Sequence, residues 1–459
     1  MRSDIVVIGG GLAGITAAMR AASLGREVTV IRKAYGATAV GCGAFDVLGT
    51  HGGDLLHSAF DLRKGAQYAP PHDLFRLITR RPAHPYALFV EQDEGSEKAV
   101  WKSFRPRFDV AASFILDRLA KAGYELEGSA EAITPHPTAM GTLRWTNFAP
   151  VSIHRGNVNG WRKGGVVFVG IDGVDTFDTA FASRSLSALL AEQGSADAGS
   201  FDARTVTLPW GRKQGGMTPA EVARELDDPE RRESFVAAVE SELAGQDADH
   251  LVMAPVLGID SHAETLHLLE KRTGARVCEP IIPAPHAIHG LRLQKALDRA
   301  LESAGVRLVQ AHVAGFDAAG SVIRMLRGEG DDGPFEAEAR RFVLATGRFF
   351  GGGLVSQNGM RETVFNLPIY HGGRPVRERP PFALLRERYW SRQPAFEAGL
   401  RAGRDLRPVD GTGRVAYANL HAAGSILGGF DLAADGTGQG VDALTGYEAG
   451  SLAAKDVQA

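Results

Sequence analysis

Apolar and polar positions follow two alternating patterns along the chain. Short apolar runs bounded by glycine or polar residues predict buried strands, and longer stretches with apolar residues three and four apart predict helices. The first strand is predicted at Asp4–Ile8, a helix follows directly behind three glycines, and a second strand is predicted at Glu27–Ile31. This order predicts a βαβ unit at the start of the chain.

A second block with the same alternation begins at Gly165. A helix at Phe108–Ala122 and short strand-like pieces near Tyr124–Leu126, Ala130–Ile133 and Thr142–Trp145 precede it. Because strands alternate with helices, we predict a largely parallel sheet in an inserted α/β domain that covers residues 100–285. Its strands are predicted at Val166–Gly170, Arg204–Leu208 and His250–Pro255, and its helices at Asp178–Gln193, Pro219–Leu226, Glu230–Leu243 and Ala263–Lys271.

The last third of the chain is predicted to return to the first domain. A final helix opens in the glycine-rich stretch Gly436–Gly440 and runs to about Ala454. The predicted domain segments are therefore 1–99, 100–285 and 286–459. The other elements expected in the last segment are a helix at Leu291–Ala304 and strands at Arg307–Gln310, His312–Phe316, Ser321–Leu326 and Arg340–Leu344.

The glycines after the first strand predict a nucleotide-binding turn. Gly9, Gly11 and Gly14 match the G-x-G-x-x-G fingerprint, with a strand before it and a helix behind it. Gly9 allows the tight turn, Gly11 lets a phosphate approach the backbone, and Gly14 lets the helix pack closely on the sheet. The alternative is a glycine-rich turn in an ordinary βαβ unit. The predicted phosphate contacts are Gly9, Gly10, Gly11, Leu12, Ala13 and Gly14, at a helix N-terminus that favours an anion.

Composition narrows the classes of protein. A length of 459 residues predicts about two or three domains. A net charge of −3 argues against a nucleic-acid partner, and no apolar run is long enough to span a membrane. Asp4 before the first apolar run and the glycines after it argue against a signal peptide. The two cysteines, Cys42 and Cys278, exclude a disulfide framework and a four-cysteine iron–sulfur cluster, predict no metal site, and favour the cytoplasm.

Three glycine-rich segments together predict a flavin site in a split domain. The first is the phosphate turn, the second is Ala345-Thr346-Gly347 behind a strand, and the third runs from Ala422 to Gly440. A helix N-terminus in the third segment would stabilise the negative charge of a reduced flavin. The fold expected is α/β, a split FAD/NAD(P)-binding Rossmann-type domain with an inserted α/β substrate or partner domain. Further predicted cofactor contacts are Gly41, Cys42, Gly43, Ala44, Val313, Ala345, Thr346, Gly347, Gly424, Ser425, Gly438, Gly440 and Val441.

Several longer segments carry a closer resemblance, which extends over nearly the whole chain. On these segments the chain resembles the B-subunit family of anaerobic glycerol-3-phosphate dehydrogenases, which is akin to fumarate-reductase-type flavoproteins. The most specific of them are Phe349–Val355 and Ser425–Asp431. The others are Ala83–Tyr86, Gly141–Arg144, Val169–Gly173, His289–Gln294, Leu344–Arg348, Leu406–Pro408 and Ala423–Gly424.

The resemblance implies an activity and partners. Members of the family oxidise sn-glycerol 3-phosphate to dihydroxyacetone phosphate with a flavin. They act with a catalytic A subunit and an iron–sulfur C subunit that passes electrons to membrane quinone, so membrane contact would come only through a partner. Two alternatives stay open. This chain could be a structural or electron-relay subunit while the A subunit does the chemistry, or it could be a stand-alone flavin oxidoreductase of the fumarate-reductase type.

The end of the second predicted strand departs from the usual FAD pattern. An acidic residue for a ribose hydroxyl is expected there, but the chain reads Ile31-Arg32-Lys33. Arg32 and Lys33 cannot accept those hydrogen bonds, although they could hold a phosphate. This favours FMN, which the family is described as using, and leaves open FAD bound differently, near Val313, and NADP.

Candidate catalytic residues lie around one of the family-like segments. His286 or His289 could act as the base that alcohol oxidation needs, and Arg292 could bind a substrate phosphate. Arg144 and Arg348 are further candidates, and for all three arginines a capping or salt-bridging role is the alternative. Cys42 is expected to act through its backbone, and His136-Pro137-Thr138 is interpreted as a chance match to fumarate reductases. The arginines of residues 374–407 predict a solvated face or a subunit-docking surface.

Overall fold

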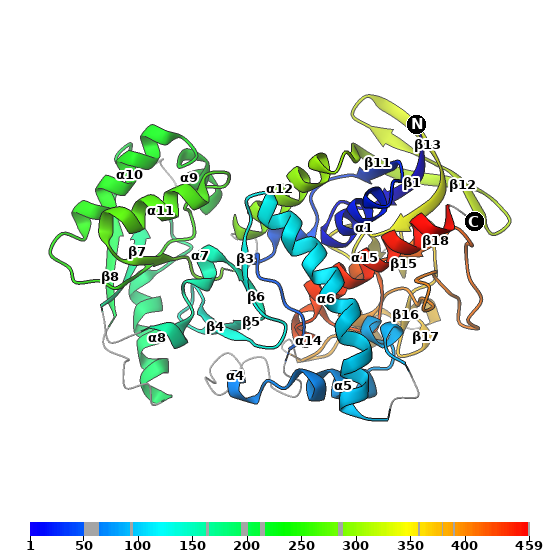
Figure 1. Ribbon diagram of the computed structural model, residues 1–459, viewed down its shortest axis with the longest axis horizontal. Helices are drawn as coiled ribbons and strands as arrows, with labels where there is room; N and C mark the ends of the chain where they lie inside the picture. Colours follow the sequence, from blue (N-terminus) through cyan, green and yellow to red (C-terminus); the bar gives the residue numbers. More distant parts are fainter. Residues whose placement is uncertain are drawn as a thin grey trace.

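The computed structural model describes residues 1–49, 64–91, 95–161, 165–193, 201–211, 216–282, 288–356, 359–378, 380–388 and 391–457. Figure 1 shows two lobes, each built on its own sheet. The larger lobe contains both ends of the chain, and the smaller lobe contains the segment drawn in green.

A six-stranded, mostly parallel sheet forms the centre of the larger lobe. β1 (Arg2–Ile8) lies between β2 (Val28–Arg32) and β13 (Gly333–Leu344), so Val6 pairs with both Thr29 and Phe342. β11 (Arg307–Ala319) extends the sheet beside β2, and β18 (Leu420–Ala422) extends it beside β13. β12 (Val322–Gly330) runs antiparallel between the outer parts of β11 and β13.

Helices α1 (Leu12–Ser23) and α15 (Gly438–Asp456) pack closely against each other on this sheet. A Cβ added at Gly446 would lie 2.4 Å from the Ala13 carbonyl oxygen, and one at Gly450 would lie 2.3 Å from that of Ala17. Only glycine permits this approach of the two backbones. The close packing places the N-termini of both helices at the same end of the sheet.

The smaller lobe is a second parallel sheet with its own hydrophobic core. Its strands lie in the order β10 (Arg276–Cys278), β9 (His250–Met253), β7 (Val166–Ile171) and β8 (Asp202–Val206). β7 is fully buried, as its unbroken apolar run predicted. The α/β class expected from the sequence is thus confirmed. The helices of this lobe are α8 (Thr179–Glu192), α9 (Pro219–Glu225), α10 (Pro229–Glu242) and α11 (His262–Thr273).

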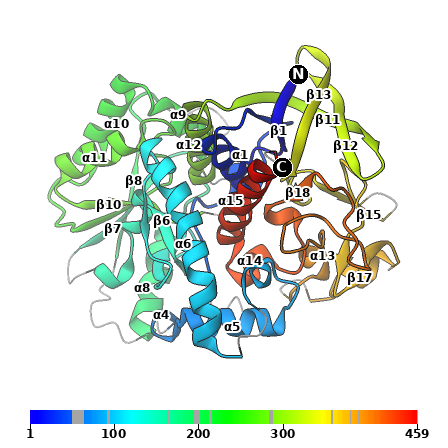
Figure 2. The same cartoon turned by 45° about the vertical axis from the view of Figure 1, so that its right-hand side comes forward.

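Helix α6 (Glu97–Lys121) is longer than the predicted helix and contains Pro106. It starts at Ser96, whose hydroxyl accepts a hydrogen bond from the Ala99 amide. Its buried side chains belong to the core of the larger lobe, and Figures 1 and 2 both draw it beside α15. The predicted boundary at residue 100 therefore falls inside a helix of the larger lobe, while the division into three segments stays a prediction.

The remaining elements are short apart from α12 (Ile288–Ser303) and α5 (Pro70–Arg80). The strand expected at Ala130–Ile133 lies instead at Thr134–Pro137, where it pairs with Leu143–Thr146. The other helices are α2 (Ala37–Val40), α4 (Lys64–Gln67), η1 (Pro85–Phe89), α7 (Val151–His154), η2 (Val158–Gly160), η3 (Val376–Glu378), η4 (Pro381–Leu384), α13 (Pro394–Glu397), η5 (Gly424–Ile426) and α14 (Leu432–Asp435). The other strands are β3 (Leu126–Gly128), β4 (Thr134–Pro137), β5 (Leu143–Thr146), β6 (Phe148–Pro150), β14 (Leu354–Ser356), β15 (Met360–Glu362), β16 (Tyr370–His371) and β17 (Arg374–Pro375). Within the described ranges, no helix is both long enough and apolar enough to cross a membrane.

Candidate functional site

A cavity of about 510 Å³ opens where β1 ends and α1 begins. The three glycine-rich segments, which are hundreds of residues apart in the sequence, all contribute to its wall. They meet because β1 pairs with β13 and α1 packs on α15. The predicted cofactor residues that line it are Gly9, Gly10, Gly11, Leu12, Ala13, Arg32, Lys33, Gly41, Gly43, Ala44, Val313, Ala345, Thr346, Gly347, Ser425 and Gly438.

The other predicted cofactor residues support this wall from behind. A Cβ on Gly14 would lie 2.0 Å from the Gly9 carbonyl oxygen, and one on Gly440 would lie 2.1 Å from the Tyr86 hydroxyl. Gly424 has a φ of +76° and lies against Ala13. Val441 is fully buried, and the Cys42 side chain packs against a small apolar cluster.

The wall offers hydrogen-bond donors that fit an anionic, hydroxyl-rich cofactor. The N-cap residues of α1 and α15, Gly11 and Thr437, make no side-chain cap hydrogen bond. One amide in each first turn is already used, because Leu12 donates to the Thr38 hydroxyl and Gly440 to the Asp46 carbonyl, and the remaining first-turn amides have no such partner among the described residues. Both helices therefore direct backbone N–H groups and a positive dipole end toward the cavity. The Thr346 hydroxyl lines the cavity and is buried without a hydrogen-bond partner among the described residues. These groups fit a flavin that carries phosphate and ribityl groups.

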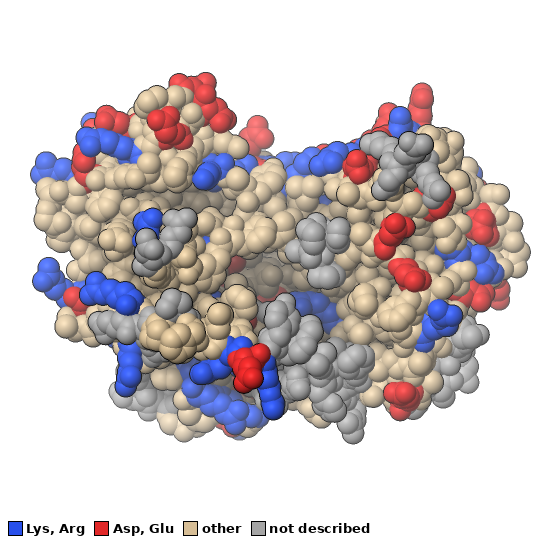
Figure 3. Space-filling view, turned by 180° about the vertical axis from the view of Figure 1, so that it is seen from behind, with Lys and Arg blue, Asp and Glu red and all other residues tan. Residues whose placement is uncertain are grey.

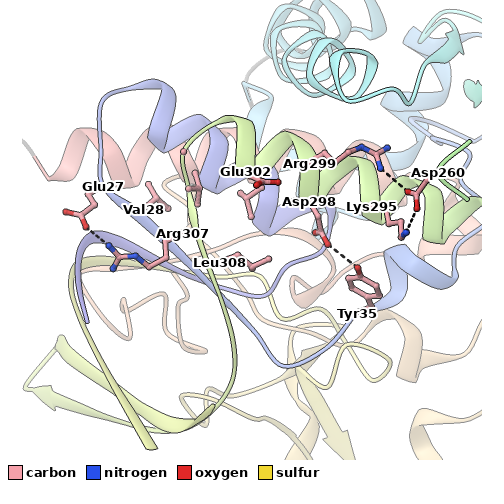
Figure 4. Close-up of a pocket in the computed structure, with 13 residues that line it drawn as sticks. Glu27, Val28, Tyr35, Asp260, Lys295, Asp298, Arg299, Glu302, Arg307 and Leu308 are labelled. Carbon is pink, nitrogen blue, oxygen red and sulfur yellow. Dashed lines mark hydrogen bonds and ion pairs between the residues drawn. The ribbon is translucent and has the colours of Figure 1, made fainter. Parts of the chain in front are cut away.

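The guanidinium of Arg32 is largely engaged in an ion pair with another side chain. Its guanidinium nitrogens donate to both oxygens of Asp298 on α12, at 2.6 and 2.9 Å. The Tyr35 hydroxyl donates to the same carboxylate at 3.2 Å, as Figure 4 shows. Lys33 is exposed and forms no ion pair with any residue in the described ranges. Lys33 is thus the freer of the two cations, and phosphate binding by either stays a prediction.

Asp442 is a cavity residue that the sequence reasoning missed. It is the fifth residue of α15 and lies beside Gly424 and the Ser425 backbone. Burial raises the pKa of its carboxyl to about 7, against the opposing effects of Arg348 and of a hydrogen bond from the Ser425 N–H. A carboxyl at this place can accept hydrogen bonds from hydroxyl groups, but no signal in the sequence around Asp442 marked it as a cavity residue.

Arg348 lines the cavity, but its guanidinium is hydrogen-bonded to other groups of the protein. It donates to the carbonyl oxygens of Phe396 and Leu427, the latter at 2.8 Å, and it lies over the Phe430 ring. Burial lowers the pKa of Arg348 to about 10. Its contacts match the structural alternative, in which this arginine holds two loops together.

Arg144 reaches from β5 to the loop that lines the cavity. Its Nη2 forms an ion pair with Asp46, and its Nε is buried with no hydrogen-bond partner among the described residues. The Asp46 carboxylate and then the Cys42 thiol raise the pKa of Arg144. The Arg144 side chain is 37% exposed. Because Asp46 engages only one of its nitrogens, Arg144 retains donors for an anionic ligand.

Two of the three predicted catalytic residues, His289 and Arg292, do not line the cavity. His289 and Arg292 lie on α12 in a buried cluster with Glu279, and Arg292 donates to both Glu279 oxygens. Burial acts to raise the pKa of Glu279, but Arg292 and His289 lower it to about 2. Burial lowers the pKa of His289 to about 4, so this histidine is neutral at pH 7. His286 lies outside the described residues. The catalytic roles of all three stay predictions.

Two further sequence features can be placed. His136, on β4, is buried and lies 2.9 Å from the Thr134 hydroxyl, and burial lowers its pKa to about 3. It does not line the cavity. In the described ranges, no three His, Cys, Asp or Glu side chains gather in a way that could hold a metal ion.

Comparisons with known proteins found one matching domain family and several relatives of similar length. The FAD binding domain family matches residues 4–441. The chain is 30% identical to a Halobacterium salinarum protein named as the probable B subunit of an anaerobic glycerol-3-phosphate dehydrogenase, covering 100% of this chain and 99% of that one. It is 27% identical to the B subunit of the anaerobic glycerol-3-phosphate dehydrogenase of Vibrio cholerae, covering 98% of this chain and 96% of the other. The protein of the same name from Pectobacterium carotovorum is 29% identical, covering 97% of both.

Solved structures add a weaker likeness. The open conformation of a flavocytochrome c3 fumarate reductase aligns with 100% of this chain and 79% of that one, at 10% identity and a TM-score of 0.42. A score this low adds nothing to the topology described above.

Proposed function

The chain belongs to the family of anaerobic glycerol-3-phosphate dehydrogenase B subunits, flavin-dependent oxidoreductases with an FAD binding domain, and on this premise we propose that it oxidises sn-glycerol 3-phosphate to dihydroxyacetone phosphate. The observation that carries this proposal is the convergence of the three glycine-rich segments and the N-termini of α1 and α15 on one cavity. A bound flavin, FMN or FAD, would supply the two-electron acceptor that alcohol oxidation requires.

The residues that would hold the cofactor divide into two groups. The α1 N-terminus at Gly11 and the exposed Lys33 offer N–H groups and a positive charge for phosphate. The Thr346 hydroxyl and the Asp442 carboxyl can donate to and accept from hydroxyl groups. The α15 N-terminus lies on the same wall and favours negative charge on the flavin ring. This assignment does not depend on the length of the nucleotide, so it suits either flavin.

Arg144 is our choice for the residue that binds the substrate phosphate. Arg144 lies next to Asp46 and Cys42. These two residues belong to the loop in which Gly43 and Ala44 line the cavity. The unused donors of Arg144 can bind a phosphate with charge-assisted hydrogen bonds, and Asp46 holds its guanidinium in place. Arg292 is less suited to this role because Glu279 already takes both of its terminal nitrogens.

A second candidate function is that of an electron-relay or structural subunit. The observation that favours it is the burial of His289 and Arg292 with Glu279, which keeps these two predicted catalytic residues out of the cavity lining. In this case the A subunit would oxidise the substrate. A stand-alone reductase of the fumarate-reductase type is the remaining alternative.

We further propose that the chain works with an A subunit and an iron–sulfur C subunit in the cytoplasm. Both cysteines are free, and Cys278 is buried, so an iron–sulfur cluster would have to come from a partner. Electrons would reach membrane quinone through that partner. Contact with the inner face of the membrane would be made by the partner and not by this chain.

The first experiment is to purify the chain alone, record its visible spectrum and identify any flavin released by denaturation. A flavin spectrum is expected. Turnover of glycerol 3-phosphate by the isolated chain with an artificial electron acceptor would support the catalytic role. Turnover that appears only after the A subunit is added would favour the relay role. Reduction of an unsaturated acid by the chain alone would contradict both, and a chain that stays colourless with FMN and FAD would contradict the flavin site.

A further inference from the structure

Five large apolar side chains are exposed on loops next to the cavity. We call them the aromatic patch. Phe350 is 64% exposed and lines the cavity itself, and Phe382 is 77% exposed. Isolated exposed apolar residues are common, but a group of this kind marks a binding surface. The patch consists of Phe349, Phe350, Phe382, Leu385 and Phe396.

The loops that carry the patch are held together by hydrogen bonds. The Phe396 carbonyl accepts from Arg348, the residue that directly precedes Phe349. The Gln393 side chain bonds the backbone of Arg386 and, at 3.0 Å, the carbonyl of Arg388. Helices η4 and α13, which contribute Phe382 and Phe396, contact each other. The patch is therefore a preformed surface, which lowers the entropic cost of binding a partner.

A cluster of ion pairs fastens the same loops to the cavity wall. Glu397 on α13 pairs with Arg81 at 2.8 Å and with Arg392 at 3.1 Å. Arg392 also pairs with Asp435 at 2.8 Å, and the Asp435 carbonyl accepts from the Gly49 amide. Asp435 lies three residues before the N-terminus of α15. A partner bound on the patch would thus contact a rigid extension of the cofactor site.

Four exposed arginines lie on the stretch of chain that also carries Phe382 and Leu385. Arg374, Arg377, Arg386 and Arg388 are exposed, and none forms an ion pair with another described residue. We call them the arginine rim. Glu387 is the exposed acid between Arg386 and Arg388. Figure 3 shows Lys and Arg side chains gathered along the lower left of the rear face, on the side where Figure 1 draws β16 and β17.

We propose that the aromatic patch and the arginine rim form the docking surface for a partner protein subunit with an apolar centre and acidic side chains around it. This inference rests on the proposed role as a subunit of a larger complex. Aromatic residues and arginine are enriched in protein interfaces, and lysine is depleted. Between residues 359 and 418 the chain has no lysine. The position at the cavity suits a partner that receives electrons.

A protein fits this surface better than a membrane does. Segments that lie on membranes are usually amphipathic helices with one continuous apolar face. Here the apolar side chains come from separate loops, and the longest helix among them, α13, has four residues. Their geometry is fixed by Gln393 and Arg348 and not by a helical repeat. Anionic vesicles are nevertheless the right competing probe, because arginine also attracts anionic lipids.

The test compares the chain alone with the chain in a complex reconstituted from the A and C subunits of the same organism. Hydrogen exchange should slow on complex formation at residues 349–351 and 382–397. The double variant Phe382→Ser with Phe396→Ser should weaken complex formation at least about tenfold. Arg386→Glu with Arg388→Glu should slow association and reduce its salt dependence. The matched controls are Phe181→Ser and Arg184→Glu. Phe181 and Arg184 are exposed on α8 in the other lobe, so these variants should change neither the strength of complex formation nor the rate of association.

The outcomes separate this inference from the proposed function. A complex that forms without protection of the patch overturns the inference and leaves the subunit role intact. Failure of the unaltered, flavin-loaded chain to form any complex overturns both. Binding of the chain alone to phosphatidylglycerol vesicles, lost in the Phe382→Ser variant, would overturn the inference in favour of a membrane surface.

Discussion

Single side chains decide which charges near the cavity are available to a ligand. Arg32, Arg292 and Arg348 all belong to segments that predicted ligand binding, yet each donates to a carboxylate or to carbonyl oxygens inside the protein. Arg144 keeps free donors because Asp46 engages one nitrogen only. Arginines at equally suggestive positions therefore differ in whether their hydrogen-bond donors are free, depending on which partner lies within reach.

Arg144→Gln should raise the KM for glycerol 3-phosphate about tenfold or more, with a smaller effect on kcat. The loss of a charge-assisted hydrogen bond to phosphate weakens substrate and transition state alike. Arg144→Lys should recover part of the affinity because it keeps the charge without the fork of donors. Steady-state kinetics of the assembled complex measure both values.

The control for this prediction is Arg155→Gln. Arg155 also pairs with a carboxylate, that of Glu270 at 2.7 Å, but Glu270 belongs to α11 of the smaller lobe, whereas Asp46, the partner of Arg144, is close to the cavity-lining residues Gly43 and Ala44. An unchanged KM in Arg144→Gln would show that the phosphate binds elsewhere.

Asp442 makes the stability of the flavin-free protein depend on pH. Its pKa is raised to about 7 in the folded protein, so the folded state keeps a proton that the unfolded chain releases above about pH 4. Stability is therefore lost as the pH rises from about 4 to 7. Asp442→Asn should remove this loss and become more stable than the wild type at pH 8, by roughly 2–4 kcal/mol. Urea unfolding of both proteins at pH 5 and pH 8 measures the difference. If the free energy of unfolding changes equally between pH 5 and pH 8 in both proteins, the assignment is refuted.

At the scale of elements, close helix packing is what shapes the cavity. Glycines on α15 let it approach α1, and this approach places both N-termini on the same wall. The strands and helices themselves follow the hydrophobic pattern to within a few residues. Two helices are exceptions: α5 was not predicted, and α6 starts earlier than predicted, because the region before Pro106 carries a weak amphipathic signal while burial against α15 stabilises it as a helix.

Gly450→Ala should separate α15 from α1. The added Cβ would lie 2.3 Å from the Ala17 carbonyl oxygen, which belongs to the backbone and cannot turn aside. We expect a loss of about 1–3 kcal/mol in stability and a higher dissociation constant for flavin. Gly160→Ala is the matched control, since a Cβ there meets no atom within 4 Å. Thermal unfolding and flavin titration test the pair, and equal behaviour of the two variants would contradict the packing argument.

At the scale of the whole molecule, the two lobes are joined through a buried charged cluster. Glu279 follows β10 of the smaller lobe and pairs with Arg292 on α12 of the larger lobe. Glu279 also accepts from the Leu257 amide at 3.1 Å. A buried ion pair of this kind adds little net stability, but the loss of one partner leaves the other charge buried and unpaired.

Glu279→Ala should therefore destabilise the protein by about 3–5 kcal/mol. The exposed cluster around Arg272 provides the control, because Arg272→Ala removes only surface ion pairs, which solvent screens and which add little stability. The midpoints of urea unfolding compare the two. Since Arg292 and His289 lower the pKa of Glu279 to about 2, the stabilising effect should be present above about pH 4 and be lost as the pH falls toward 2. A wild-type midpoint that does not change below pH 4 would argue against this.

Much of the fold could be predicted because it depends on local patterns. Apolar runs such as Val166–Ile171 are buried strands, and Gly9, Gly11 and Gly14 occupy their positions for reasons that hold in any nucleotide-binding βαβ unit. Most of the predicted cofactor residues line the cavity for the same reason. Asp442 could not be found in this way, since nothing in its own neighbourhood indicates that β18 and η5 end beside it.

The sequence by itself determined the α/β class, the positions of the main strands and helices, the three glycine-rich segments and the family. The tertiary structure alone decided that these segments form one cavity, that Arg32 pairs with Asp298 and Arg292 with Glu279, and that Arg144 keeps free donors. The physical reason is one of range. Hydrophobic periodicity and glycine spacing act over a few residues, whereas a charge is paired or free according to which distant side chain the packed chain brings within hydrogen-bond distance.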